Sequence, residues 1–211
     1  MSLAIIKVDK KSKQHSVYSD GRVLKGTEIM LENSPKIFKY DLGYIATCKC
    51  NASVLGASIG SLYLDNFIDS FLEDELSGIE SLWDISRDIP RVVEDLTEAY
   101  NKLWQKYCLH RNIPVNSIRH ASYEGLLSIN GYLFHIDSYD LDDNVVFQVY
   151  YMDKGYDIIG AGKTLAMPLL EYGVTDMQKV FDIVSSKEAS VNANVFLYEG
   201  ITYGQDRRDE D

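Results

Sequence analysis

The pattern of hydrophobic and polar positions predicts β structure in the first part of the chain. Residues 3–8 (LAIIKV) form an apolar, β-branched run that is typical of a strand buried on both faces. The polar residues 9–13 favour a hairpin tip before a returning strand. Two further strands are predicted at residues 36–40 and 43–48, with a turn at Asp41-Leu42.

A helical period follows, from about residue 51 to residue 112. Asn51 is a candidate N-cap for the first helix. Apolar residues then recur at roughly helical spacing, at Leu55, Ile59, Leu62, Phe67 and Phe71. A second helix is expected to begin at Pro90, a favourable first-turn residue, and to end at Asn112-Ile113-Pro114. The middle of the chain is therefore predicted to be a pair of helices.

Strand patterns resume in the second half of the chain. Residues 124–129 and 132–137 are joined by Asn130-Gly131, a strong hairpin turn because both residues tolerate positive φ. Residues 145–151 and 156–159 are predicted to extend the sheets.

A second helix pair is expected after Gly160-Ala161-Gly162 and after Thr175, which has capping-box spacing to Gln178. A last strand is predicted at residues 194–198. Strands grouped apart from helices favour an α+β fold, a four-layer αββα sandwich of two antiparallel sheets flanked by helix pairs. We expect one domain over residues 1–204 and an acidic tail at residues 205–211.

Composition excludes several classes of protein. With 45% apolar residues, the 211-residue chain can build a sizeable core. A net charge of −11 argues against a broad nucleic-acid-binding surface. Three cysteines do not suggest a disulfide framework, and no stretch of about 18 apolar residues could span a bilayer. We expect a cytoplasmic protein, without a leader segment, that binds neither nucleic acid nor membrane.

Two short motifs could indicate a metal or a nucleotide, and both are weak. Cys48-Lys49-Cys50 with His110 or His120 could bind zinc, but structural zinc sites usually have four ligands and wider cysteine spacing, so buried, inert cysteines are favoured. Residues 160–164 (GAGKT) match the end of a P-loop, yet Asp157 stands where that motif needs its first glycine. The sequence predicts no metal and no cofactor.

Ser19-Asp20-Gly21-Arg22 places an acid beside an arginine, and Lys36 follows that acid by 16 positions. Gly160-Ala161-Gly162 precedes a predicted helix, and Lys187-Glu188-Ala189 precedes the last predicted strand. In this order, over about residues 1–200, these segments resemble the acid-and-arginine turn, the lysine, the glycine-serine-glycine turn and the last loop of a proteasome β-type subunit, including the bacterial HslV type. The resemblance implies the N-terminal-nucleophile hydrolase fold, in subunits that assemble into closed rings around an inner chamber.

The resemblance also implies a catalytic arrangement. The family's nucleophile is a threonine at the mature N-terminus, with its free α-amine as base. By position, Lys36 fits the family's buried lysine, Asp20 the acid that holds it and Arg22 the arginine. No threonine precedes Thr27, so Ser2 is the hydroxyl that removal of Met1 would expose. Matching residues 5–8 (IIKV) to the family's strand, however, puts Met1 and not Ser2 at the nucleophile position, and a one-residue shift turns a side chain to the other face of the sheet.

Other positions depart from the family pattern. Ala161 stands where the family has a serine near the nucleophile, Glu188 replaces an aspartate and Val191 replaces a serine. Cys50-Asn51 is matched to the glycine pair whose N–H lines the oxyanion hole.

Two functions therefore remain open. The first is peptide-bond hydrolysis inside a homo-oligomeric ring, with Ser2 as nucleophile and Lys36 and Asp20 in support. Peptides or unfolded proteins would be its substrates, and an ATP-dependent unfoldase is a candidate partner. The second is a catalytically inactive structural or scaffold homologue that keeps the ring architecture and binds partners.

Overall fold

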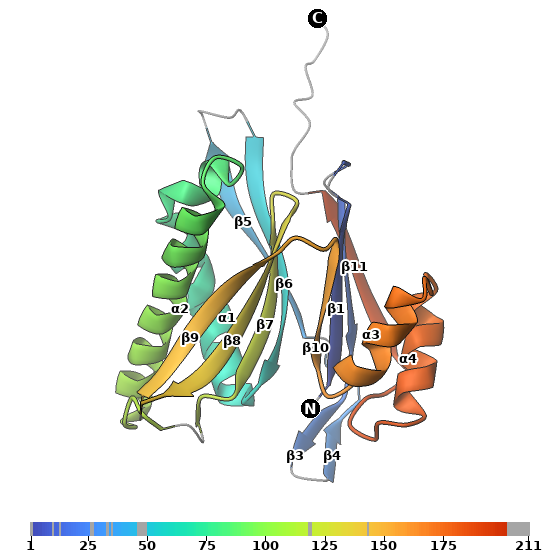
Figure 1. Cartoon of the computed structure of the whole chain (residues 1–211). Helices are drawn as coiled ribbons and strands as arrows, with labels where there is room; N and C mark the ends of the chain where they lie inside the picture. The colour runs from blue at the N-terminus through green and yellow to red at the C-terminus, as the bar shows by residue number, and fades with distance from the viewer. Residues whose placement is uncertain are drawn as a thin grey trace, which may run out of the picture.

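The chain folds into two stacked antiparallel β-sheets with a pair of helices on the outer face of each (Figure 1). The computed structural model describes residues 2–9, 11–12, 14–25, 28–32, 34, 36–45, 50–117, 120–142 and 144–201. This arrangement confirms the predicted α+β class and the four-layer αββα sandwich. The domain bounds 1–204 remain a prediction, and the predicted tail lies outside the described residues.

The larger sheet has the strand order β5-β6-β7-β8-β9. These strands are β5 (Ile37–Ile45), β6 (Cys50–Gly60), β7 (Tyr123–Ile129), β8 (Tyr132–Leu141) and β9 (Asn144–Met152). Asn130 and Gly131 join β7 to β8 with φ of 50° and 80°, which confirms the predicted hairpin turn. Each strand pairs with its sequence neighbour, so the sheet is an antiparallel meander interrupted only between β6 and β7.

The predicted helix from Asn51 is wrong over its first ten residues, because residues 50–60 form strand β6. Leu55 and Ile59 pack into the layer between the two sheets, and Val54 faces the opposite side. A strand buried on both faces shows no alternation, and its Leu55–Ile59 spacing imitates a helical repeat. The turn predicted at Asp41-Leu42 is also wrong, since β5 continues through it with an irregularity before Tyr44.

Helices α1 (Leu62–Ser77) and α2 (Ile89–Arg111) cover the outer face of the larger sheet, with a short 3-10 helix (Glu80–Asp84) between them. Helix α2 confirms the predicted bounds. Asp88 caps its first turn by accepting a hydrogen bond from the Arg91 N–H, and Asn112 ends it in a left-handed conformation. None of the described helices is long and apolar enough to cross a membrane.

The smaller sheet has the order β10-β1-β2-β11. Its strands are β10 (Tyr156–Gly160), β1 (Leu3–Asp9), β2 (Gln14–Asp20) and β11 (Val195–Ile201). As predicted, β1 is buried on both faces: Leu3 and Ile5 face the outer helices, whereas Ala4 and Ile6 face the other sheet. This places the N-terminal strand at the centre of the molecule.

Helices α3 (Lys163–Glu171) and α4 (Met177–Ser185) cover the outer face of the smaller sheet. The N-cap of α4 is Asp176, one residue after the predicted Thr175, and its carboxylate accepts a hydrogen bond from the Lys179 N–H. A separate hairpin, β3 (Val23–Lys25) and β4 (Glu28–Leu31), projects from one end of the sandwich (Figure 1).

A buried histidine interrupts the apolar layer between the sheets. His15 in β2 is 3% exposed, and its Nδ1 lies 3.0 Å from the Ser128 hydroxyl in β7. Burial, followed by the charge of Lys39, lowers the pKa of His15 to about 4. The folded protein therefore resists protonation of His15 at a pH where the unfolded chain accepts the proton.

We expect this histidine to make the fold acid-sensitive. Its contribution is fully present above the unfolded pKa of about 6.5 and is lost as pH falls from there to about 4. The loss should reach about 2–3 kcal/mol in the free energy of unfolding. Denaturant unfolding at pH 7 and at pH 4 measures it, and His15→Gln should lose correspondingly less stability over the same interval. Equal losses in both proteins would contradict the assignment to His15.

Candidate active site

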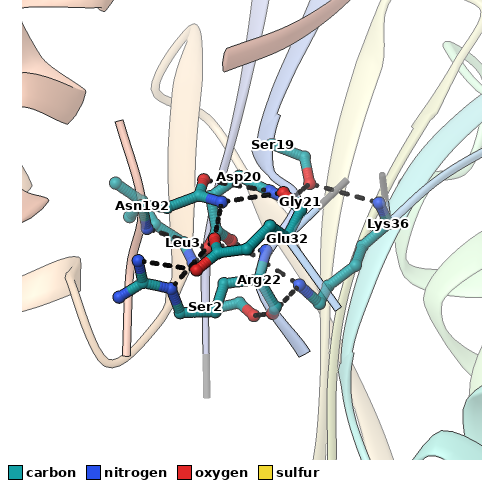
Figure 2. Close-up of polar contacts among 9 residues, drawn as sticks. All are labelled: Ser2, Leu3, Ser19, Asp20, Gly21, Arg22, Glu32, Lys36 and Asn192. Carbon is teal, nitrogen blue, oxygen red and sulfur yellow. Dashed lines mark hydrogen bonds and ion pairs between the residues drawn. The ribbon is translucent and has the colours of Figure 1, made fainter. Parts of the chain in front are cut away.

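Asp20, at the end of β2, is fully buried and contacts three separate segments of the chain (Figure 2). The Asp20 carboxylate accepts hydrogen bonds from three main-chain N–H groups, those of Leu3 (3.0 Å), Arg22 (3.3 Å) and Asn192 (3.3 Å). It also forms an ion pair with Lys36, whose Nζ lies 3.6 Å from Oδ1. Asp20 thus joins the start of β1, the turn after β2 and the segment before β11.

Ser2 and Lys36 meet at one main-chain carbonyl. The Ser2 hydroxyl donates to the Arg22 carbonyl oxygen at 3.1 Å, and Lys36 Nζ donates to the same oxygen at 2.8 Å (Figure 2). Burial lowers the pKa of Lys36, an effect that the charge of Asp20 opposes. The structure therefore brings together the three residues that the sequence predicted as catalytic, as a hydroxyl, a cation and a buried carboxylate.

The pairing of β1 fixes which residue occupies this place. Leu3 lies opposite Gly160 and Ala4 lies opposite Ser19, which puts Ser2 just before the first strand pair. Ser2 is 1% exposed. Through the Arg22 carbonyl oxygen that both contact, Ser2 therefore lies beside Lys36 in the described geometry.

The Arg22 side chain forms further polar contacts around the site, with Glu32 and the Ala189 carbonyl. Its guanidinium contacts the Glu32 carboxylate at 3.3 Å and 3.2 Å and donates to the Ala189 carbonyl oxygen. The Asn192 amide donates to the same carboxylate at 2.7 Å. These two contacts, that with Asn192 first, hold the pKa of Glu32 below its usual range. Glu32 and Asn192 carried no signal in the sequence, because they reach the site only through the fold.

Gly160 lies against the main chain of Ser2. Its φ is +93°, and a Cβ atom there would lie 2.0 Å from the Ser2 carbonyl oxygen, so a glycine is required. Its N–H donates to the Glu124 carboxylate at 2.8 Å. Ala161, the next residue, is half-buried and has no hydroxyl to offer.

The loop between α4 and β11 contains Glu188 and Val191, two of the positions that depart from the family pattern. Glu188 accepts hydrogen bonds from the N–H (3.0 Å) and hydroxyl (2.7 Å) of Ser190, which lower the pKa of Glu188. Val191 is fully buried in the core under α3 and α4. Glu188 is therefore held by its own loop in the described structure, and Val191 has a packing role.

The resemblance matched Cys50-Asn51 to the glycine pair of the oxyanion hole. Cys50 instead begins β6, and its side chain, like Cys48, lies outside the described residues. The segment that leads into the first helix is Ile59-Gly60, at the far end of β6. Both residues line a pocket together with Ser2. The described geometry therefore favours Gly60 over Cys50 as the residue nearest the candidate nucleophile.

The pocket beside Ser2 has a volume of about 170 Å³. Ser2 and Lys36 line it from one side, and α1 contributes Asp65, Asn66 and Asp69. Burial raises the pKa of Asp65 to about 7; the charge of Lys36 opposes this shift and that of Asp69 adds to it. Sequence reasoning did not single out Asp65, which lies in the middle of a predicted amphipathic segment.

Other clusters in the described part of the chain give no sign of a metal centre. No group of three or more histidine, cysteine, aspartate or glutamate side chains is arranged there to hold a metal ion. The candidate pair Cys48 and Cys50 falls outside the side chains that the structure describes.

Comparison with known proteins gives matches in structure only. No family model and no curated protein sequence matches the chain. BPH from Thiobacillus denitrificans, solved in complex with epoxomicin, superposes with a TM-score of 0.61 at 11% identity, over 96% of this chain and 99% of BPH. Anbu, an ancestral β-subunit from Yersinia bercovieri, gives 0.60 at 15% identity, over 97% and 84%.

A third structure, the helical assembly of the Anbu complex from Pseudomonas aeruginosa, gives a TM-score of 0.62 at 15% identity, over 94% of this chain and 81% of that one. Identities this low establish the fold alone. The chain therefore has the four-layer α+β sandwich fold that BPH and the Anbu β-subunits share.

Proposed function

We propose that this chain is a peptidase subunit of a proteasome-like, self-assembled ring, with Ser2 as its N-terminal nucleophile. The observation that carries the proposal is the convergence of the Ser2 hydroxyl and Lys36 Nζ on one carbonyl oxygen, that of Arg22. The fully buried Asp20 forms an ion pair with Lys36. It also accepts a hydrogen bond from the N–H of Leu3, the residue that follows Ser2. A hydroxyl placed beside a cation in a pocket is suited to attack a carbonyl.

The chemistry requires a free amine on Ser2. Removal of Met1 would supply it, and an α-amine with an unperturbed pKa of about 7.7–8.0 is suited to act as a base near neutral pH. As the Ser2 oxygen bonds to the substrate carbonyl carbon, the amine takes the hydroxyl proton. It passes this proton to the leaving amine when the peptide C–N bond breaks. Water then attacks the ester and restores the Ser2 hydroxyl.

Each supporting residue has a distinct part in these steps. The Lys36 cation stabilises the negative charge that develops around the Ser2 oxygen. Asp20 is a positioning residue, because among the described contacts it reaches Ser2 through Lys36 and the Leu3 N–H. Arg22 offers the shared carbonyl, and its own side chain is held by Glu32.

The structural neighbours support the remaining parts of the proposal. The Pseudomonas aeruginosa Anbu complex forms a helical assembly, which supports self-association of this chain. Thiobacillus denitrificans BPH was solved in complex with epoxomicin, which supports testing that compound here. Peptides or unfolded proteins are the proposed substrates, and an ATP-dependent unfoldase is a candidate partner of the ring.

One observation favours the alternative, a catalytically inactive scaffold subunit. Neither Ala161, beside Gly160 and the Ser2 main chain, nor the buried Val191 offers a hydroxyl to a proton-transfer network. In a scaffold, Asp20 and Lys36 would serve the fold alone.

Intact mass spectrometry with epoxomicin separates the two functions. We expect a mass that lacks Met1 and rises by one epoxomicin molecule, with no increase in Ser2→Ala. Ser34→Ala is a matched control, because Ser34 lines the same pocket and should still permit the adduct. A mass that retains Met1, or a free Ser2 that takes no adduct, would reject the peptidase and favour the scaffold.

A further inference from the structure

A second acid lies in the pocket beside Ser2, outside the Asp20 network. Asp65 is in the first turn of α1, and its Oδ1 is buried without a hydrogen-bond partner in the described part of the chain. Buried polar atoms are almost always paired, so an orphaned carboxylate oxygen lining a pocket calls for an explanation. Asp65 makes no contact that the Ser2 chemistry requires.

The charged groups nearest to Asp65 are already engaged with other partners. Lys36 donates to the Arg22 carbonyl and pairs with Asp20, so Asp65 receives only its longer-range charge. Asp69, one turn further along α1, accepts a hydrogen bond from the Tyr40 hydroxyl. The Asp65 Oδ1 atom therefore accepts no hydrogen bond from any described neighbour.

The lining of the pocket is both apolar and polar. Ile37, Phe38 and Leu62 contribute apolar groups, whereas Asp65 and Asn66 contribute polar groups from α1. A lysine or arginine side chain likewise combines an aliphatic stem with a charged end. Such a side chain could place its stem against the apolar wall and its charge beside Asp65.

Lys36 and Arg22 also line the pocket, but each is paired with a carboxylate and should not repel a further positive group. Lys36 is balanced by Asp20, and Arg22 is balanced by Glu32. The carboxyl groups of Asp65 and Asp69 then have no cation of their own in the lining, and a positive group beside Asp65 would favour its ionised form over the neutral form that burial favours. The pocket is therefore electrostatically suited to a positive group.

We propose that this pocket selects substrates with lysine or arginine at the residue whose carbonyl Ser2 attacks, and that Asp65 is the specificity-determining counter-ion. This inference rests on the proposed peptidase function, because it takes the attacked bond to lie at Ser2. Ser2 is among the residues that line the pocket, so the proposal places there a side chain next to the attacked bond.

Two fluorogenic peptides that differ only in lysine or norleucine before the cleaved bond test the proposal. Norleucine keeps the aliphatic stem and removes the charge. We expect the wild type to cleave the lysine peptide with a kcat/KM at least about 10-fold higher, as one well-placed charge pair provides. In Asp65→Asn this ratio should fall to about 1–3. Asp74→Asn, an exposed change of the same kind on α1, should keep the wild-type ratio.

A binding measurement separates failure of this proposal from failure of the peptidase function. Acetylated tripeptide amides ending in lysine or norleucine are titrated by calorimetry into the wild type and Asp65→Asn, after thermal unfolding has shown that the variant folds. Lysine-selective binding that Asp65→Asn abolishes, without any cleavage, would support the cation pocket and reject the peptidase. Cleavage without lysine preference would support the peptidase and overturn the cation pocket. Neither binding nor cleavage would overturn both.

Discussion

Lys36→Met is expected to lower the kcat/KM for peptide hydrolysis by about 100- to 1000-fold, the usual effect of removing one preorganised electrostatic donor. Methionine keeps an unbranched apolar stem in the half-buried site and removes the ammonium that shares the Arg22 carbonyl with Ser2. Asp20 retains its three main-chain N–H partners in this variant, so the fold should persist. Hydrolysis of a fluorogenic peptide, with size-exclusion chromatography to follow assembly, measures both effects.

Lys39→Met is the matched control for this prediction. Lys39 is an exposed residue of β5, three positions from Lys36, and its ammonium lies over the Tyr198 ring. Its replacement makes the same change in charge outside the Ser2 pocket, so hydrolysis should stay within about threefold of the wild type. Wild-type activity in Lys36→Met would instead show that Ser2 works without this cation and would remove the main support for the proposed mechanism.

The layered architecture could be predicted because several of its strands and helices have clear short-range sequence patterns. The apolar run at the start of the chain, the stripe along α2 and the Asn130-Gly131 turn each specify one structure by short-range rules. Strand β6 could not be predicted in this way. It is buried between two layers, and its Leu55–Ile59 spacing satisfies a helical template as well as a strand.

The residues of the candidate site could be predicted only in part, for a related reason. Asp20 and Lys36 stand out because a resemblance fixes their spacing, whereas Asn192 comes from 172 positions further along and meets Asp20 only in the fold. Asp65 was hidden because an acid on an amphipathic helix is usually solvated, and nothing local shows that it turns into a pocket. Long-range convergence of this kind leaves no short-range pattern.

Asp20→Ala should lower the free energy of unfolding by about 3–5 kcal/mol, the cost of breaking a buried ion pair by removing one partner. The substitution leaves the half-buried ammonium of Lys36 without its counter-ion and deprives three main-chain N–H groups of their acceptor. Each such group then bears its own desolvation cost. Because these donors come from the start of β1, the turn after β2 and the segment before β11, the loss should also loosen the Ser2 end of β1.

Asp20→Asn distinguishes the charge of this residue from its hydrogen bonding. Asparagine with its amide oxygen at the Oδ1 position can still accept from the Leu3 N–H and faces Lys36 with that oxygen, but its NH2 group then meets the N–H donors of Arg22 and Asn192. We expect a destabilisation about half as large as in the alanine variant, measured by urea unfolding at pH 7. Hydrolysis should fall in both variants, because Asp20 positions Lys36. A loss of less than about 1 kcal/mol in Asp20→Ala would mean that water replaces the carboxylate easily, and that this acid does not hold the site together.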